Sequence, residues 1–241
     1  MGIDDASDRL VALSDGMLSV WDTRTAAMLG EPVRLGSTPE EVAWYQRNGD
    51  FSDRPGHPHQ IAITAPDGSL ELWDIEQRRQ IRTIPTSIPT EIVPHFGEVE
   101  FDSTGDRLVY VGANSTIEMW DAETATATGA PIAAPGIQSL LGFDSAGYLI
   151  TEDESSVNFW DLEAGHQSGS LRLPTGVYGA TVEDGQRIDV GGSFELPYQL
   201  PITAEQWFGH LCRTLNRGFT EFERTLLPPE TDLSRPCSKG Q

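Results

Sequence analysis

Four copies of a Trp-Asp pair constrain the fold of this 241-residue chain more than any other feature. Each pair ends a run in which apolar and polar residues alternate, as in LSVWD, LELWD, IEMWD and VNFWD. The tryptophans of these pairs are separated by 52, 47 and 40 residues along the chain. A repeat of this length indicates an array of similar units that pack on their neighbours. These tryptophans are Trp21, Trp73, Trp120 and Trp160.

Each Trp-Asp pair closes the same sequence pattern. One alternating run, a short polar turn and a second alternating run follow one another, as in QIAITAPDGSLELWD. This period of two is typical of strands, and the turn residues are those of tight hairpins. A second type of turn recurs as FDSTGDRL and FDSAGYLI, and a further apolar run, such as IRTIP or SLRLP, follows the Trp-Asp pair. The pattern predicts an all-β fold made of four-stranded antiparallel units, the blades of a β-propeller.

The repeats resemble those of the WD-repeat β-propeller family. The Gly-His pair that usually opens such repeats is missing from most of them, and only Gly56-His57 matches it. We therefore do not expect the histidine-to-aspartate hydrogen-bond network of the family, and we expect packing to hold the blades together. The resemblance implies about five blades, at 1–36, 37–86, 96–135, 136–174 and 175–201, followed by a helical tail at 202–241 with a disordered end.

The first and last units deviate from the repeat. The opening MGIDDASDRLVALS corresponds to a turn and a second strand, so the first blade is expected to lack its innermost strand. The fifth unit (VYGATVE, RIDVGG and FELPYQL) lacks Trp-Asp and an evident outer strand. Because an open ring exposes apolar blade faces, we expect the C-terminal part of a longer propeller, with the missing upstream blades in the same or another chain. A closed five-bladed ring and a half-propeller completed by a separate chain are the alternatives.

Two prolines and one long segment locate further elements. Pro32 in GEPVRL and Pro131 in GAPIA lack an amide hydrogen, so they are expected in the outermost strand, where no ladder partner is needed. The segment from Gln46 to His59 is expected to lengthen a turn between a first and a second strand.

The tail changes to a helical period. Thr203 and Gln206 form a capping box, and Gly218 ends the first helix. Thr220 and Glu223 form a second capping box, which predicts a helical hairpin that packs its Trp207 side on the propeller. His210 and Cys212 point about 200° apart on such a helix, so they cannot share a metal ion. The apolar stripe of the first helix comprises Trp207, Phe208, Leu211, Cys212 and Leu215.

The tail resembles the C-terminal extension of many bacterial WD-repeat proteins. Several of these proteins carry a signalling ATPase or another effector domain upstream, so the resemblance implies that such a domain precedes this segment. The matching positions are Trp207, Leu211, Cys212, Arg217, Thr220, Glu223, Leu227, Pro228 and Cys237.

Charge limits the classes of partner. The chain has 37 acidic and 16 basic residues and a formal net charge of −21, without a basic patch. Because such a surface repels phosphate backbones and anionic lipids, we expect no nucleic-acid and no membrane partner. The single lysine, Lys239, excludes a phosphate-binding loop and a buried lysine nucleophile. No apolar run approaches a membrane span and no signal peptide is evident, so a cytoplasmic location is expected.

The candidate binding residues lie in loops. In the family that these repeats resemble, the turns between second and third strands and the connections between blades commonly form the binding face. The segment from Thr86 to Glu98 lengthens one such connection, and TEDESS forms a turn on the same face. The acidic side chains predict a protein partner with a basic patch, whose association slows as salt rises. The candidate residues are Glu91, Ile92, His95, Phe96, Asp153 and Glu154.

Signatures of catalysis are weak in this chain. His57 and His59 would share a metal ion only on a strand, and Pro58 favours a loop without a third ligand nearby. No Gly-x-Ser-x-Gly elbow is present. We therefore expect a non-catalytic scaffold or sensor for protein partners, with no cofactor and no metal. The alternative is an enzyme whose site lies in the central channel of a propeller.

Overall fold

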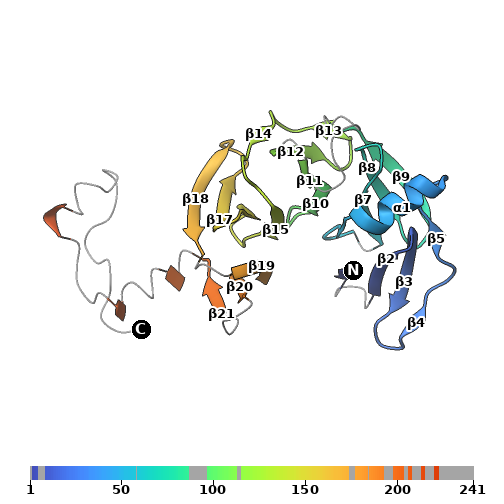
Figure 1. The fold of residues 1–241 in the computed structure, drawn as a ribbon, viewed down its shortest axis with the longest axis horizontal. Helices are drawn as coiled ribbons and strands as arrows, with labels where there is room; N and C mark the ends of the chain where they lie inside the picture. Colours follow the sequence, from blue (N-terminus) through green and yellow to red (C-terminus); the bar gives the residue numbers. More distant parts are fainter. Residues whose placement is uncertain are drawn as a thin grey trace.

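A chain of antiparallel sheets forms the molecule, and the sheets follow one another along an arc (Figure 1). The inner strands β1, β6, β10, β15 and β19 are consecutive neighbours along this arc. Among the described strands, no sheet closes on itself. The computed structural model describes residues 2–4, 9–57, 59–86, 97–112, 115–173, 177–183, 185–192, 198–203, 206–207, 213–214 and 220–222.

The first sheet contains a strand that we did not expect. Its order is β1-β2-β3-β4, with β5 also pairing with β3. Gly2 pairs with Val11, which places β1 in the innermost position, so the expectation that this unit lacks its innermost strand is wrong. Three residues without an apolar alternation carry no strand signal, and the pairing with β2 alone defines β1. The bounds are β1 Gly2–Asp4, β2 Arg9–Ser14, β3 Met17–Asp22, β4 Ala27–Met28 and β5 Val33–Arg34.

The second sheet begins later than its sequence suggested. Helix α1, Pro39–Asn48, precedes the inner strand β6, Phe51–Asp53. The expected long turn from Gln46 to His59 is therefore wrong, because it contains the end of a helix and a whole strand. The remaining strands are β7 Gln60–Thr64, β8 Leu70–Asp74 and β9 Arg79–Ile84, in the order β6-β7-β8-β9.

A capping box starts helix α1. The side chain of Thr38 accepts a hydrogen bond from the Glu41 amide at 3.2 Å, and the Glu41 carboxylate accepts one from the Thr38 amide at 3.1 Å. Pro39 occupies the first turn, where its missing amide hydrogen is not needed. These local signals lie in the sequence STPEEVAWY, and they favour a helix over the strand that the repeat pattern would place there.

The last three sheets repeat the same order with a shorter final member. The third sheet runs β10-β11-β12-β13, with β14 also on β12; the fourth runs β15-β16-β17-β18; and the described part of the fifth has three strands, β19-β20-β21. The bounds are β10 Gly97–Phe101, β11 Arg107–Gly112, β12 Thr116–Asp121, β13 Thr126–Ala127, β14 Ile132–Ala133, β15 Ser139–Phe143, β16 Leu149–Glu152, β17 Ser156–Asp161, β18 His166–Arg172, β19 Val177–Glu183, β20 Arg187–Gly192 and β21 Tyr198–Pro201.

Both prolines occupy the outer edge, as predicted. Pro32 directly precedes β5 and Pro131 directly precedes β14, and each of these strands pairs only with the third strand of its sheet. In both sheets the outermost strand is split into two short pieces around the Gly-x-Pro segment. The outer strands β9 and β18, which lack proline, run without this interruption.

The aspartate of each Trp-Asp pair closes the turn that leads to the outer strand. Asp121 Oδ1 accepts hydrogen bonds from the amides of Glu123, at 3.0 Å, and Thr124, at 2.7 Å. Asp22 and Asp161 bind the amides two and three residues ahead in the same way, whereas Asp74 binds only that of Gln77. The repeat therefore shares a local turn-closing interaction, whereas of the four rings only that of Trp160 is buried and the other three are half-buried.

Four apolar cores lie between consecutive sheets. Ile61 and Ile63 belong to the core shared with the first sheet, whereas Ala62 between them belongs to the core shared with the third. The same alternation occurs at Leu149 and Ile150 in the fourth sheet. Because successive side chains of a strand point to opposite faces, each middle sheet contributes to two cores and both faces are apolar.

Side chains also accept backbone hydrogen bonds across the sheet boundaries. Asp50 Oδ2 accepts a bond from the Val99 amide of the third sheet at 3.0 Å. Glu98 of the third sheet accepts one from the Leu140 amide of the fourth. The same arrangement joins the fourth sheet to the fifth, where Glu152 Oε2 lies 3.4 Å from the Ala180 nitrogen.

The structure describes residues 202–203, 206–207, 213–214 and 220–222 of the tail. Thr203 Oγ1 accepts a hydrogen bond from the Gln206 amide at 3.3 Å and donates one to Gln206 Oε1 at 2.8 Å, which agrees with the predicted first helix start. Trp207 lines a cavity of about 310 Å³ with Tyr148 and Phe159, so it lies against the fourth sheet. No helix among the described residues is long and apolar enough to cross a membrane. Phe208, His210, Leu211, Cys212, Leu215, Arg217, Gly218, Glu223, Leu227, Pro228 and Cys237 lie outside the described residues.

Candidate functional site

The described turns lie on two surfaces of the arc. We call the surface with the turns between second and third strands and the connections between sheets the connection face. The opposite surface, with the turns between first and second strands and the turns after each Trp-Asp pair, is the Trp-Asp face. The candidate residues from the sequence were all expected on the connection face.

Two of those candidates, Asp153 and Glu154, lie among the described residues. They differ in how far their carboxylates are free to bind a partner. Asp153 and Glu154 form the turn between β16 and β17, as expected. Asp153 accepts hydrogen bonds from the Ser155 amide at 2.8 Å and the Asn158 side chain at 2.9 Å, so its carboxylate holds the turn. Burial raises the pKa of Asp153, but these hydrogen bonds outweigh it and the pKa is lowered. Glu154 is exposed. Glu91, Ile92, His95 and Phe96 lie outside the described residues.

A cavity of about 360 Å³ opens on the connection face between the first and second sheets. The connection after β5, helix α1 and the turn between β7 and β8 meet around it. Residues more than 30 positions apart in the sequence thus form one wall, which no local pattern could have indicated. The lining residues are Arg34, Leu35, Gly36, Ser37, Glu41, Tyr45, Ala65, Pro66, Asp67, Glu71, Trp73 and Gln80.

Two aromatic side chains hold the carboxylate of Glu71 on this wall. The indole Nε1 of Trp73 donates a hydrogen bond to Glu71 Oε2 at 2.8 Å. The Tyr45 side chain is also hydrogen-bonded to Glu71. Burial raises the pKa of Glu71, the bond from Trp73 opposes this, and the negative charges of Asp67 and Glu41 raise it further. Burial, followed by the negative charges of Glu71, Asp67 and Glu41, raises the pKa of the Tyr45 hydroxyl as well.

A second group of perturbed carboxyls lies along the inner strands. Burial, followed by repulsion from Asp50, raises the pKa of Glu100 to about 7. Burial also raises the pKa values of Asp50 and Glu98. Perturbed carboxyls are one sign of catalytic acids. Here, however, Asp50 and Glu98 accept backbone amides of the next sheet, and Glu100 is hydrogen-bonded to Ser52. We therefore assign these carboxyls a structural role, in which they connect neighbouring sheets.

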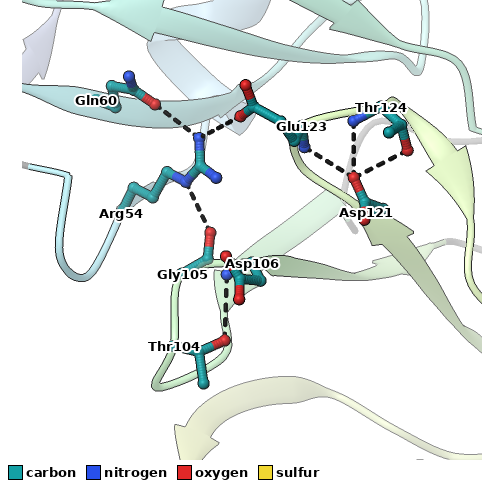
Figure 2. A network of polar contacts seen from close by, with 8 residues as sticks. All are labelled: Arg54, Gln60, Thr104, Gly105, Asp106, Asp121, Glu123 and Thr124. Atoms are coloured by element: carbon teal, nitrogen blue, oxygen red, sulfur yellow. Dashed lines mark hydrogen bonds and ion pairs between the residues drawn. The ribbon is translucent and has the colours of Figure 1, made fainter.

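A buried arginine joins the second and third sheets on the Trp-Asp face (Figure 2). The side chain of Arg54 is 2% exposed, and its Nε donates to the carbonyl of Gly105 at 2.7 Å. Its Nη1 donates to Gln60 Oε1 at 2.8 Å and lies 3.4 Å from the carboxylate of Glu123. The guanidinium also lies 5.9 Å from the centre of the Phe101 ring. The sequence predicted only a long polar turn here, and an arginine in a turn looks like any solvated charge.

The histidines of GHPH belong to a turn that contacts the segment after β8. His57 and His59 lie in the turn between β6 and β7, and His59 Nε2 is 3.8 Å from Glu76 Oε2. In the part of the chain that the structure describes, no three His, Cys, Asp or Glu residues are grouped to hold a metal ion.

Comparison with models of protein families and with curated proteins found no match to this chain. The likeness of its Trp-Asp repeats to the WD-repeat family therefore stays a prediction from the residues themselves.

Proposed function

We propose that this chain is a non-catalytic scaffold of the WD-repeat β-propeller type, which binds a protein partner through its connection face. Support for the propeller comes from the repeated order of the sheets, their inner strands along one arc and the shared turn after each Trp-Asp pair. In this proposal, further blades from the same or a separate chain complete the ring. The proposed location is the cytoplasm.

One observation carries the binding proposal: the connection face has a cavity whose wall displays the carboxylates of Glu41, Asp67 and Glu71. Glu154 is exposed on the same face, between the second and third strands of the fourth sheet. With a net charge of −21, the chain attracts basic surfaces and repels nucleic acids and anionic lipids. A protein partner with arginine or lysine residues fits this face best.

Charge reversal on one face at a time tests the proposal. The immobilised chain is used to capture partners from cell extract, and the captured proteins are quantified. We expect the double variant Glu40→Arg and Glu154→Arg, with both changes on the connection face, to lose captured proteins that the unchanged chain retains. Both side chains are exposed, so the fold should tolerate the changes.

The matched control is the double variant Asp106→Arg and Glu163→Arg on the Trp-Asp face. These residues are also exposed, and the change in net charge is the same. If both variants lose the same proteins to the same extent, binding depends on net charge alone and the connection face has no special role. Association should also slow as ionic strength rises.

A further inference from the structure

We propose that the cavity between the first and second sheets receives the guanidinium of an arginine side chain presented by the partner protein. This inference rests on the proposed scaffold function and names the place and the chemistry of the contact. The cavity lies beside α1, away from the inner strands that line the arc, so it is distinct from a central-channel site.

The charges around the cavity are unbalanced. Glu41, Asp67 and Glu71 line it together with a single cationic residue, Arg34. Arg34 is exposed and forms no ion pair with these carboxylates among the described contacts. The mutual repulsion of the carboxylates raises the pKa of Glu71, after the larger effect of burial. A cation in the cavity would relieve this repulsion, which provides a driving force for binding.

The central acceptor is held in place before any ligand arrives. Hydrogen bonds from Trp73 and Tyr45 orient the Glu71 carboxylate. A carboxylate accepts about four hydrogen bonds, so two aromatic donors leave room for a further donor. A fixed acceptor loses little conformational entropy on binding, and this favours affinity. The other two carboxylates hold local structure, Glu41 at the helix cap and Asp67 in the turn to Ser69, but they keep their charge.

The shape of the wall favours a planar cation. Trp73 and Tyr45 supply aromatic surface next to the carboxylate, and a guanidinium combines flat packing on such rings with forked hydrogen bonds to carboxylates. A lysine ammonium makes a point contact and is more strongly hydrated. The volume of about 360 Å³ is at the lower end of ligand pockets, which suits one side chain rather than a large molecule.

A local probe can test binding directly. The protein has six tryptophans, so its indole N–H groups give few NMR signals, and the variant Trp73→Phe identifies that of Trp73. The ligand is the peptide Gly-Ser-Gly-Arg-Gly-Ser-Gly with blocked ends. We expect titration with this peptide to shift the Trp73 indole signal in a saturable way. The same peptide with citrulline, which is neutral and similar in shape, should shift it little, and the lysine peptide should bind more weakly than the arginine peptide.

The variant Glu71→Gln isolates the carboxylate charge. Glutamine still accepts bonds from Trp73 and Tyr45, so the fold should persist, and we expect affinity for the arginine peptide to fall about tenfold. The control Glu163→Gln, exposed on the opposite face, should leave affinity unchanged. Any of three results would overturn the inference. The Trp73 signal does not shift at millimolar peptide, the citrulline peptide shifts it equally, or Glu71→Gln binds the arginine peptide with unchanged affinity. If this happens while capture remains specific to the connection face, the scaffold function stands without this pocket.

Discussion

The guanidinium Nε of Arg54 lies 2.7 Å from the carbonyl oxygen of Gly105, and this hydrogen bond connects the turn at the start of the second sheet with the corresponding turn of the third (Figure 2). The Gly105 end of this contact is held in a closed turn. The turn that carries Gly105 is closed by a bond from the Gly105 amide to the Asp102 carbonyl at 3.0 Å. An arginine of the second sheet thus donates a hydrogen bond to a backbone carbonyl of the third.

We expect Arg54→Met to destabilise the protein by about 2 to 4 kcal/mol. Methionine can fill much of the space, but it leaves the Gly105 carbonyl and the Gln60 side chain without their buried donor. Urea denaturation measures the free energy of unfolding. The control Arg79→Met removes an exposed arginine from β9 and should change this free energy by less than about 0.5 kcal/mol. Equal effects of the two changes would show that Arg54 is only a surface charge.

Gly105→Ala should destabilise the protein more than Gly147→Ala, although the two glycines occupy the same position of the repeated FDSxG turn. Both have positive φ, 76° at Gly105 and 89° at Gly147, so both variants bear a similar backbone strain of about 1 kcal/mol. A Cβ at Gly105 would lie 2.2 Å from the Pro55 carbonyl oxygen, whereas nothing lies within 4 Å of one at Gly147. Thermal or urea unfolding of the pair measures the difference, and equal losses would contradict the close contact between sheets.

Replacing the aspartates of the Trp-Asp pairs by alanine should lower the free energy of unfolding by different amounts. Asp121 Oδ1 accepts three hydrogen bonds, two from amides and one from the Thr124 hydroxyl, whereas Asp74 accepts one. The amide of Thr124, followed by its hydroxyl, lowers the pKa of Asp121. We expect Asp121→Ala to lower the free energy of unfolding by about 1 to 2 kcal/mol and Asp74→Ala by less. A larger effect at Asp74 in urea denaturation would mean that the aspartates act other than by closing these turns.

Stability should decrease as the pH rises through the range in which Glu100 ionises. The pKa of Glu100 is raised from 4.5 to about 7 in the folded protein, so the folded state binds its proton more tightly than the unfolded state. The stabilising effect is complete below about pH 4.5 and is lost as the pH approaches about 7, with a total of up to about 3 kcal/mol. Urea denaturation between about pH 5 and about pH 8 measures this decrease. The variant Glu100→Gln should flatten the decrease, and an unchanged pH dependence would assign it to other groups.

Sequence periodicity predicted the middle of each sheet but not its inner edge. In each strand that ends in Trp-Asp, apolar residues two positions apart enter one core, so an apolar alternation marks these strands. The inner strands β1 and β6 have three residues each and are defined by pairing with their neighbours, for which the sequence has no local signal. Helix α1 was missed for another reason, because the capping signals at Thr38 and Glu41 were present and the repeat pattern outweighed them.

The sequence predicted the connection face and a set of loop residues on it, but not the residues that line the cavity near Glu71. The turn with Asp153 and Glu154 lies where the strand order predicted it. The cavity near Glu71 depends on α1 and on the packing of the first sheet against the second, so its residues meet only in three dimensions. One signal was available in retrospect: Glu71 alternates with apolar neighbours within a strand, two positions before Trp73, where a half-buried carboxylate needs a donor.

Among the described residues, the three carboxylates that accept backbone amides across the sheet boundaries act in one direction, from a sheet to its successor in the chain: from Asp50 to the third sheet, from Glu98 to the fourth and from Glu152 to the fifth. A single sheet copied into another position would therefore need an amide at the matching place in the inner strand of its new successor. The smallest exchangeable module is a sheet together with the inner strand that follows it. Gene duplication or engineered recombination should respect that boundary, which is offset from the boundary of the Trp-Asp repeat.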